Sequence, residues 1–312
     1  MKKVGVIGGS GFIGSYITKA FLNQGYQVKV STTNISREDK YEHLMVFNKS
    51  DNLHISELDV TDKIALKDFV SDCDVVIHSG TPFILDVQDP KSQLFDPTIN
   101  GTENFLDVIN STPGIEKVVF IASVAAWNTN FPFPAELKNF TDTFDEEDTR
   151  FTSTESHPYA QAKFIANHMV DTFIEENPDI EFEISSVSPV MVMGKSLSKR
   201  EDSTSGGFQY LIKNNMAPDD FIQTLYDNDV PLAIVDVEDV ANATFKAATT
   251  LGLHGKNYLL SSETYKVSDV QAMLNNDPPK EDPSIIYKND LATAELDIQF
   301  KPVIETLNSY SN

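Results

Sequence analysis

The chain has 312 residues, of which 40 % are hydrophobic, and a formal net charge of −23 at pH 7. This length supports a full hydrophobic core in one large domain or in two closely joined ones. The strong excess of acidic residues argues against nucleic acid and anionic membrane surfaces as partners, because both would repel a polyanion.

The single cysteine, Cys73, excludes an intrachain disulfide and fits a reducing compartment. It lies in an apolar run, so we expect a buried small side chain and not a reactive thiol. Glycines interrupt the apolar run near the start of the sequence, and no small-residue cleavage site follows it, unlike a secretory signal. No stretch approaches the roughly 18 apolar residues of a membrane helix. We therefore expect a cytoplasmic protein without a membrane partner, either a monomer or a homodimer.

Acidic residues are unevenly distributed along the chain. It contains 47 Asp and Glu residues, yet none lies between Met1 and Arg37, where Lys2, Lys3, Lys19 and Lys29 are basic. A polyanionic ligand held by this segment would explain the gap. A chance gap in composition is the alternative interpretation.

The first half of the chain alternates β-branched apolar runs with segments of helical spacing. Strands are predicted at residues 3–7, 27–32, 54–58, 74–78 and 117–121, and helices at residues 12–22 and 90–110. Strands that alternate with helices imply βαβ units and a parallel sheet covered on both faces. Because such crossovers are right-handed, we predict an α/β fold with a doubly wound, Rossmann-type parallel sheet.

The second half is less regular. Residues 128–155 are rich in Pro, Thr, Asp and Phe and predict a loop, and a loop of this length is often functional. A helix is predicted at residues 158–176, with Ser156 as its cap and Pro158 in its first turn.

The domain organisation follows from this division. We assign residues 1–164 to the Rossmann-type domain and residues 165–312 mostly to a smaller, substrate-binding lobe. Apolar runs near residues 183–193 and 231–240 are expected to return to the large sheet as strands.

A glycine-rich segment, Gly8-Gly9-Ser10-Gly11-Phe12-Ile13-Gly14, stands between the first predicted strand and the first predicted helix. Its early glycines permit a tight turn and a close approach of the backbone to a pyrophosphate. Gly14 permits close packing of helix and strand, and the helix N-terminus offers N–H groups to the anion. In this position between strand and helix, the pattern predicts a dinucleotide site.

The end of the second predicted strand bears on which dinucleotide binds. An acid there would bind the ribose 2′-OH of NAD and repel the 2′-phosphate of NADP. Here Thr32 is followed by Thr33, Asn34, Ser36 and Arg37, without an acid. Hydroxyl, amide and guanidinium groups suit a phosphate, so we expect NADP, with NAD as the alternative cofactor.

Tyr159 and Lys163 stand four residues apart on the predicted helix, so their side chains share one face. A free tyrosine titrates near pH ~10 and exchanges protons poorly at neutral pH. A neighbouring cation would lower its pKa toward the working range. Ser123 follows the strand at 117–121, at the edge of the sheet where ligands of doubly wound folds bind. Its hydroxyl would hydrogen-bond a substrate carbonyl, or else satisfy local backbone.

Seven motifs occur in one order along the chain: Gly8–Gly14, Asp59-Val60, His78-Ser79-Gly80-Thr81-Pro82-Phe83, Asn100-Gly101-Thr102, Ser123-Val124-Ala125-Ala126, Tyr159/Lys163 and Ser188-Pro189. With them the sequence resembles, over nearly its whole length, an extended short-chain dehydrogenase/reductase, in the superfamily of NAD-dependent epimerases and dehydratases. Within it, the chain is most similar to the branch of dihydroflavonol 4-reductases, cinnamoyl-CoA reductases and yeast methylglyoxal reductase.

The resemblance implies catalytic roles for Tyr159 as the proton donor, Lys163 as the group that lowers its pKa and holds the ribose, and Ser123 as the group that positions the carbonyl. It also implies contacts to the cofactor from the glycine turn, the adenine and phosphate pockets and the nicotinamide pocket. These residues are Gly8, Gly11, Phe12, Ile13, Gly14, Thr32, Arg37, Asp59, Val60, Ser79, Gly80, Thr81, Tyr159, Lys163, Pro189 and Val192. No metal site is implied.

Some positions depart from the family's usual residues. Ile121 and Ala122 stand where hydroxyl residues often precede the serine, and Ala162 replaces the usual serine before the lysine. Ser188 stands where asparagine often precedes the proline, and Thr33 stands where reductases of this branch often carry arginine. None of these departures removes a group that the chemistry needs.

The leading hypothesis is an NADPH-dependent reductase of an aldehyde or ketone, reversible as an alcohol dehydrogenase. A nucleotide-sugar epimerase or dehydratase, which shares the fold and the three catalytic groups, is the first alternative. A dinucleotide-sensing protein without enzymatic activity is the second.

Overall fold

The large sheet of the computed structural model, which describes residues 2–47, 51–79, 89–199 and 204–311, has seven strands. Every adjacent pair in it is parallel. Its strand order is β3 (Leu53–Glu57), β2 (Gln27–Thr32), β1 (Lys3–Ile7), β4 (Val75–His78), β5 (Lys117–Ile121), β6 (Glu183–Pro189) and β9 (Asn257–Leu260). The order runs outward from β1 in both directions, as in a doubly wound sheet. The predicted fold class is confirmed.

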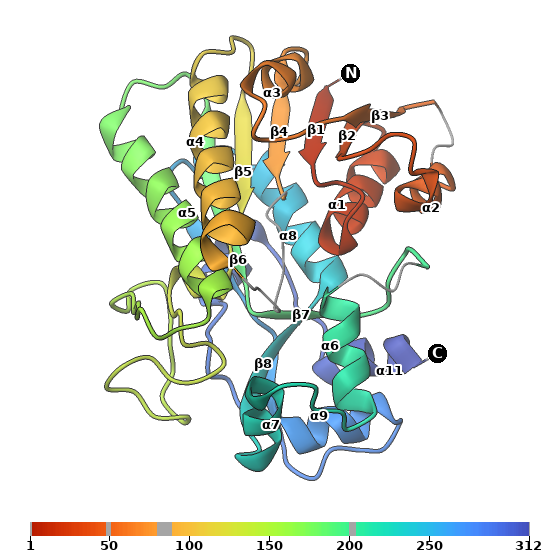
Figure 1. Cartoon of the computed structure of the whole chain (residues 1–312), viewed down its shortest axis with the longest axis vertical. Coiled ribbons are helices and arrows are strands. Elements are labelled where there is room, and N and C mark those ends of the chain that lie inside the picture. The colour runs from red at the N-terminus through yellow and green to blue at the C-terminus, as the bar shows by residue number, and fades with distance from the viewer. Residues whose placement is uncertain (1, 48–50, 80–88, 200–203, 312) are drawn as a thin grey trace.

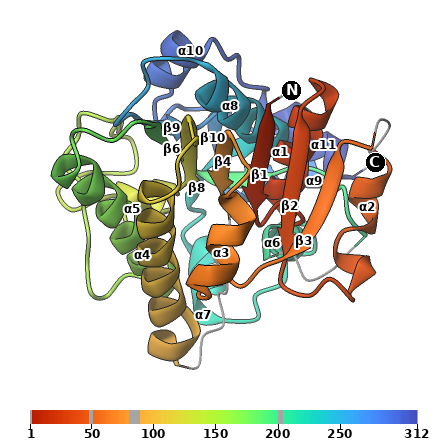
Figure 2. The same cartoon turned by 90° about the horizontal axis from the view of Figure 1, so that it is seen from above.

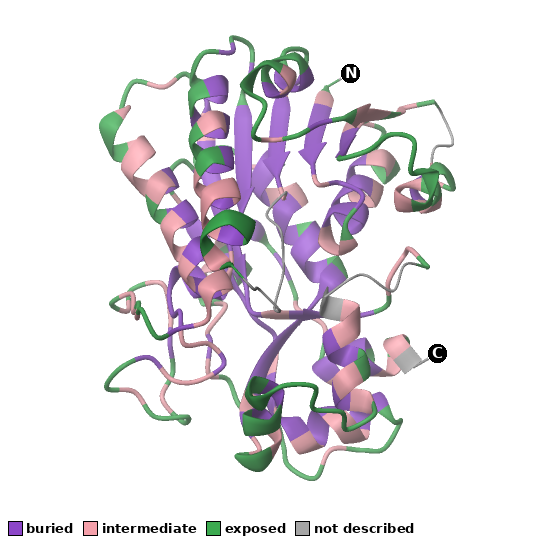
Figure 3. Ribbon diagram, viewed as in Figure 1, coloured by how far each residue is buried: buried purple, intermediate pink, exposed green. Residues whose placement is uncertain are grey.

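Helices cover both faces of this sheet (Figures 1 and 2). On one face α1 (Phe12–Asn23) packs against α8 (Val237–Thr249), and on the other lie α3 (Lys63–Val70), α4 (Asp96–Asn110) and α5 (Pro158–Glu176). The central strands are buried between these layers (Figure 3). Two-sided burial explains why these strands read as continuous apolar runs without alternation.

A smaller unit is built on a three-stranded sheet of β10 (Glu263–Lys266), β8 (Pro231–Asp236) and β7 (Met191–Met193). A second apolar core lies between this sheet and its helices. These helices are α6 (Thr204–Lys213), α7 (Asp220–Asp227), α9 (Val267–Leu274) and α11 (Val303–Ser311). The remaining short elements are η1 (Glu38–Lys40), α2 (Glu42–Met45), η2 (Lys91–Phe95), η3 (Val124–Ala126) and α10 (Asp290–Leu296).

Of the two runs expected to return to the large sheet, residues 183–189 do so as β6, and the run at 231–240 does not. The apolar run at 183–193 divides at Val190, whose N–H still bonds to Leu260 of the large sheet while Met191 pairs with Ile234 of the small one. The segment at 231–240 does not return to the large sheet. It forms β8, and then the Asp236 carboxylate accepts the Glu238 N–H and starts α8. The seventh strand of the large sheet is β9. The prediction was wrong because apolar periodicity indicates that a strand is buried but not which sheet it joins.

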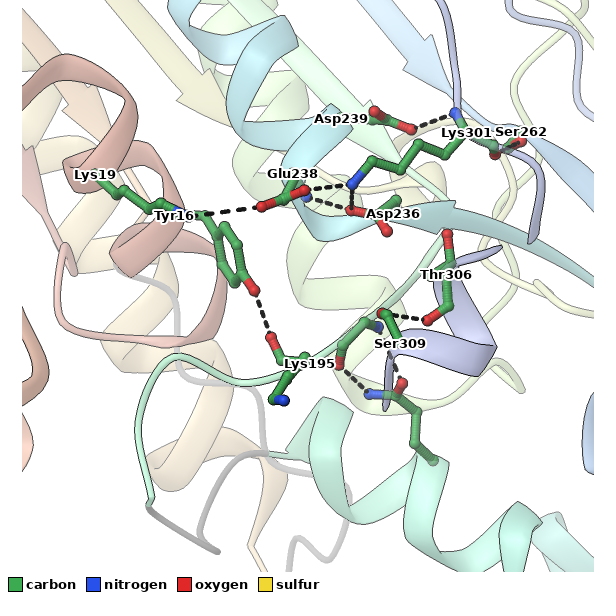
Figure 4. Close-up of polar contacts among 12 residues, drawn as sticks. Tyr16, Lys19, Lys195, Asp236, Glu238, Asp239, Ser262, Lys301, Thr306 and Ser309 are labelled. Atoms are coloured by element: carbon green, nitrogen blue, oxygen red, sulfur yellow. Dashed lines mark hydrogen bonds and ion pairs between the residues drawn. The ribbon is translucent and has the colours of Figure 1, made fainter. Parts of the chain in front are cut away.

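A polar network ties the N-terminal helix to distant parts of the chain (Figure 4). Lys301 forms an ion pair with Glu238 at the start of α8, and Glu238 also lies 3.6 Å from Lys19 of α1. One turn earlier on α1, the Tyr16 hydroxyl donates to the carbonyl oxygen of Lys195, at 2.7 Å. The network therefore holds the segment that follows β7 against the helix that follows the glycine turn.

The predictions for Cys73 and for membrane helices are also addressed by the structure. Cys73 is a free thiol with 5 % exposure, and burial raises its pKa to about 12, as expected for an inert core residue. Within the described part of the chain, no helix is long and apolar enough to cross a bilayer.

Candidate active site

The glycine turn links β1 to α1. Gly8 has a φ of +76°, a conformation that favours glycine. A Cβ at Gly14 would lie 2.1 Å from the Gly8 carbonyl oxygen, so a side chain there would force the turn apart. No side chain caps α1, and its first turn carries no acid. The open N-terminus and the close backbone packing fit a diphosphate held against this turn.

The adenine end of the expected cofactor site contains acids that the linear sequence did not place there. The Glu57 carboxylate of β3 accepts the Ile35 N–H at 2.9 Å, next to the end of β2. Arg37 donates to the Asp39 carboxylate through Nε at 2.8 Å and Nη2 at 2.7 Å. The β2 end itself, which includes buried Thr32, is free of acids, but its spatial neighbours are not.

Other residues expected at the cofactor lie at the carboxyl edge of the sheet. Asp59 is exposed, and its carboxylate accepts bonds from the Thr61 N–H and hydroxyl, at 2.9 and 2.7 Å. The partly buried Val60 contacts α4 at Gly101, where an added Cβ would lie 3.1 Å from Val60. Ser79 follows β4, and its N–H bonds to Ile7 of β1 at 3.0 Å. Gly80 and Thr81 fall outside the described residues.

Ser123 lies directly beyond the carboxyl end of β5. Its side chain caps the short η3 helix by accepting the Ala125 N–H at 3.2 Å. The residue is partly exposed, whereas the neighbouring Ala122 and Val124 are buried. The hydroxyl therefore keeps its own proton available at the edge of the sheet where ligands bind.

Tyr159 and Lys163 lie in the first two turns of α5. The Nδ1 of His157 accepts the Tyr159 N–H at 3.2 Å and caps this helix. Ser156 is therefore not the cap, contrary to the prediction, because its hydroxyl bonds to Thr129. Lys163 is 3 % exposed, and its Nζ donates to the Ile121 carbonyl oxygen at 2.8 Å.

Burial dominates the electrostatics of this pair. It raises the pKa of the Tyr159 phenol above its ordinary value, and it lowers the pKa of Lys163 to about 7. The effect of the Lys163 cation on the pKa of Tyr159 stays a prediction. In both groups burial disfavours the charged form, because less water solvates it, and Lys163 with a pKa of about 7 is about half protonated at neutral pH. A neutral phenol is the form that a proton donor needs.

A cavity of about 310 Å³ brings several of these residues together. The expected residues that line it are Ile13, Ser123, Tyr159, Pro189 and Val192. They come from α1, the β5 end, α5, β6 and β7, so the cavity opens where the two sheets meet. The glycines of the turn, the adenine-end residues and Lys163 do not line it. Lys163 lies behind Tyr159, one helical turn further along α5.

The sequence indicates the loop at 128–155 as functional, but it does not identify the individual aromatic residues of this cavity wall. Phe131, Phe133, Phe208 and Phe221 line it together with Met191. They lie in the loop at 128–155, in α6 and α7 and in β7, so only the tertiary fold brings them together. The aromatic and proline content of residues 131–133 was the one signal in the sequence.

His78 is a buried polar residue that the expected chemistry does not use. Its ring stacks on Phe120 at 5.0 Å and contacts Phe105 at 4.5 Å. Neither ring nitrogen has a hydrogen-bond partner in the described structure. Burial and the nearby Lys163 lower the pKa of His78 to about 3, so the imidazole is neutral. Among the described residues, no cluster of His, Cys, Asp and Glu is placed to hold a metal ion.

Comparison with known proteins identifies a family for this chain. The NAD dependent epimerase/dehydratase family matches residues 4–261, from β1 to just beyond β9. The chain belongs to this family.

Individual relatives are distant but cover nearly the full chain. The chain is 28 % identical to the NADPH-dependent methylglyoxal reductase of Saccharomyces cerevisiae, over 88 % of this chain and 82 % of that protein. It is 25 % identical to an anthocyanidin reductase of Vitis vinifera, over 88 % of this chain and 80 % of that one. The crystal structure of the yeast methylglyoxal/isovaleraldehyde reductase with NADPH superposes with a TM-score of 0.81, at 23 % identity, over 99 % of this chain and 97 % of that one.

Proposed function

We propose that this protein is an NADPH-dependent reductase of aldehydes or ketones, reversible as an alcohol dehydrogenase. One observation carries the proposal. The phenol residue Tyr159 and the hydroxyl residue Ser123 come from separate elements to line one largely apolar cavity. The same cavity is lined by Ile13, in the first turn of the helix that follows the glycine turn. The smaller unit supplies the opposite, substrate-facing wall.

The cofactor assignment rests on the fit of the glycine turn to a diphosphate and on the NADPH-dependent reductases among the relatives. The glycine turn would hold the diphosphate and Arg37 the 2′-phosphate. Lys163 would hold the nicotinamide ribose, and Pro189 and Val192 would contact the nicotinamide. The bound nicotinamide supplies a hydride to the carbonyl carbon of the substrate.

The chain's own groups then handle the carbonyl oxygen. Ser123 donates a hydrogen bond to this oxygen and fixes the carbonyl plane. Burial keeps the Tyr159 phenol protonated. The phenol then delivers this proton to the carbonyl oxygen as negative charge develops on that oxygen. The apolar lining excludes water from the reacting carbonyl and strengthens both interactions.

The alternatives account less well for the cavity. A nucleotide-sugar epimerase or dehydratase must hold a second diphosphate, and the described cavity lining contains no lysine or arginine for that purpose. A dinucleotide sensor needs no proton donor at a substrate cavity, whereas Tyr159 lines one. Reductase activity therefore fits the arrangement best.

The proposal is tested by measuring NADPH and NADH oxidation by the purified protein with aldehydes, ketones and nucleotide sugars. We expect steady oxidation of NADPH with aldehydes or ketones and the appearance of the corresponding alcohol. Conversion of a nucleotide sugar without net oxidation of the cofactor would instead identify an epimerase or dehydratase.

A further inference from the structure

The cavity wall that faces the substrate is aromatic and apolar. Phe131 and Phe133 reach it from the loop at 128–155, and Phe208 and Phe221 reach it from α6 and α7. The rings of Phe133 and Phe221 lie 6.5 Å apart in an edge-to-face arrangement. A flat apolar group fits between such rings better than a hydrated polar one.

Most polar side chains of the cavity lining already have partners within the protein. The Thr129 and Ser156 hydroxyls lie 2.9 Å apart, and Ser156 donates to the Asn130 side-chain oxygen at 3.0 Å. His157 accepts the Tyr159 N–H through Nδ1, a bond that requires this nitrogen to carry no proton. These contacts stabilise the loop and leave few groups to solvate an ionic substituent.

Glu155 is different. It is the one acidic residue among the described residues that line the cavity, and the described lining contains no lysine or arginine to neutralise it. Glu155 is exposed, and its backbone N–H donates a hydrogen bond to the Ser153 hydroxyl oxygen at 3.1 Å. Because Glu155 is exposed, solvent partly screens its charge, and it acts on a charged ligand in the cavity through a modest electrostatic interaction.

We propose that Glu155 is a specificity-determining residue, which disfavours carbonyl compounds carrying a carboxylate or phosphate group. The inference rests on the proposed reductase function. It concerns the charge of the substrate and goes beyond the reaction type, because the proton donor and the glycine turn would serve a neutral and an anionic carbonyl compound equally well.

The test compares two substrates of nearly equal shape, 4-formylbenzamide and 4-formylbenzoate, in the wild-type enzyme and in Glu155→Gln. We expect the wild-type enzyme to prefer the amide, and the substitution to reduce the ratio of the two kcat/KM values about fivefold, as for partly screened like charges. In Glu155→Gln the kcat/KM for 4-formylbenzoate should rise, and that for 4-formylbenzamide should stay unchanged. Glu147→Gln removes an exposed carboxylate of the same loop that does not line the cavity, and it should leave the ratio unchanged.

A binding measurement separates this inference from the reductase proposal. Benzamide and benzoate are titrated into the wild-type protein and Glu155→Gln by calorimetry, without turnover. We expect the wild type to bind benzamide more tightly than benzoate, and Glu155→Gln to reduce the ratio of the two Kd values. An unchanged binding or kcat/KM ratio in Glu155→Gln would overturn the role of Glu155. Absence of turnover with these and every other aldehyde and ketone tested would overturn the reductase proposal, and the binding ratio would then decide the role of Glu155 alone.

Discussion

The Nζ of Lys163 donates a hydrogen bond to the carbonyl oxygen of Ile121, the last residue of β5, at 2.8 Å. The same nitrogen lies 5.6 Å from the centre of the Phe120 ring, within range of a cation–π interaction. These contacts tie α5 to the strand that precedes Ser123. The relative placement of the Tyr159 phenol and the Ser123 hydroxyl therefore depends on this buried lysine.

The charge of Lys163 should govern cofactor affinity above neutral pH. Burial lowers its pKa to about 7, so the cation is lost as the pH rises through that value. We expect the Kd of NADPH to rise several-fold between about pH 7 and about pH 9 in the wild type and to stay flat in Lys163→Met, where the charge is absent. The 2′-phosphate is already ionised over this range, at a pKa of about 6. Fluorescence titration at each pH gives both curves, and two curves of the same shape would contradict the role of the lysine.

The neutral, buried His78 should make the fold sensitive to acid. Its folded-state pKa of about 3 lies below the ordinary 6.5, so the unfolded chain binds the extra proton first and stability falls as the pH drops below 6.5 toward 3. At about pH 5 the wild type should have lost about 2 kcal/mol through this group. Urea unfolding gives the free energy of unfolding of the wild type and of His78→Leu, which lacks the titrating group. The difference between these two free energies should change by that amount between pH 7.5 and about pH 5. A constant difference between the two proteins would refute the assignment.

Arg37 should determine the preference for NADPH over NADH, in competition with Asp39. The guanidinium is paired with the Asp39 carboxylate and has to exchange that partner for the 2′-phosphate. Arg37→Ala should weaken NADPH binding about tenfold and leave NADH binding unchanged. Asp39→Asn, which removes the competing carboxylate, should strengthen NADPH binding. Equal effects of Arg37→Ala on both cofactors would show that the arginine does not contact the 2′-phosphate.

The glycine turn should not tolerate a methyl group at its last position. A Cβ at Gly14 would lie 2.1 Å from the Gly8 carbonyl oxygen and 2.8 Å from Gly9. Gly14→Ala should therefore lower the melting temperature and abolish dinucleotide binding. Gly207→Ala on α6 is the matched control, because nothing lies within 4 Å of its added Cβ. The control should keep its melting temperature or raise it, since alanine favours a helix over glycine by about 1 kcal/mol. Normal NADPH binding by Gly14→Ala would place the diphosphate elsewhere.

The local elements of the fold were predictable because their signals are local. Helix α1 after the glycines and strand β5 appear at nearly the predicted bounds, Phe12–Asn23 and Lys117–Ile121. The strand at 231–240 was assigned to the wrong sheet, because its partners, β7 and β10, are distant in sequence. No periodicity encodes which of two sheets a buried strand joins.

The chemistry of the site was predictable only in part, for the same reason. Tyr159 and Lys163 share a helix, so their spacing is visible in the sequence. Glu57 reaches the end of β2 from the neighbouring strand, and no linear pattern indicates it. The raised pKa of Tyr159 follows from its burial in the folded structure, which no linear pattern indicates. The aromatic wall likewise depends on contacts between α6, α7 and the loop at 128–155.

The central claim is that Tyr159 delivers the proton in an NADPH-dependent carbonyl reduction, and Tyr159→Phe tests it most directly. The variant removes the hydroxyl and keeps the ring against the cavity. We measure NADPH affinity by fluorescence and single-turnover reduction of an accepted aldehyde. The expected result is cofactor binding within about twofold of wild type and a rate lower by about 10²–10⁴. Undiminished reduction by Tyr159→Phe would contradict the account.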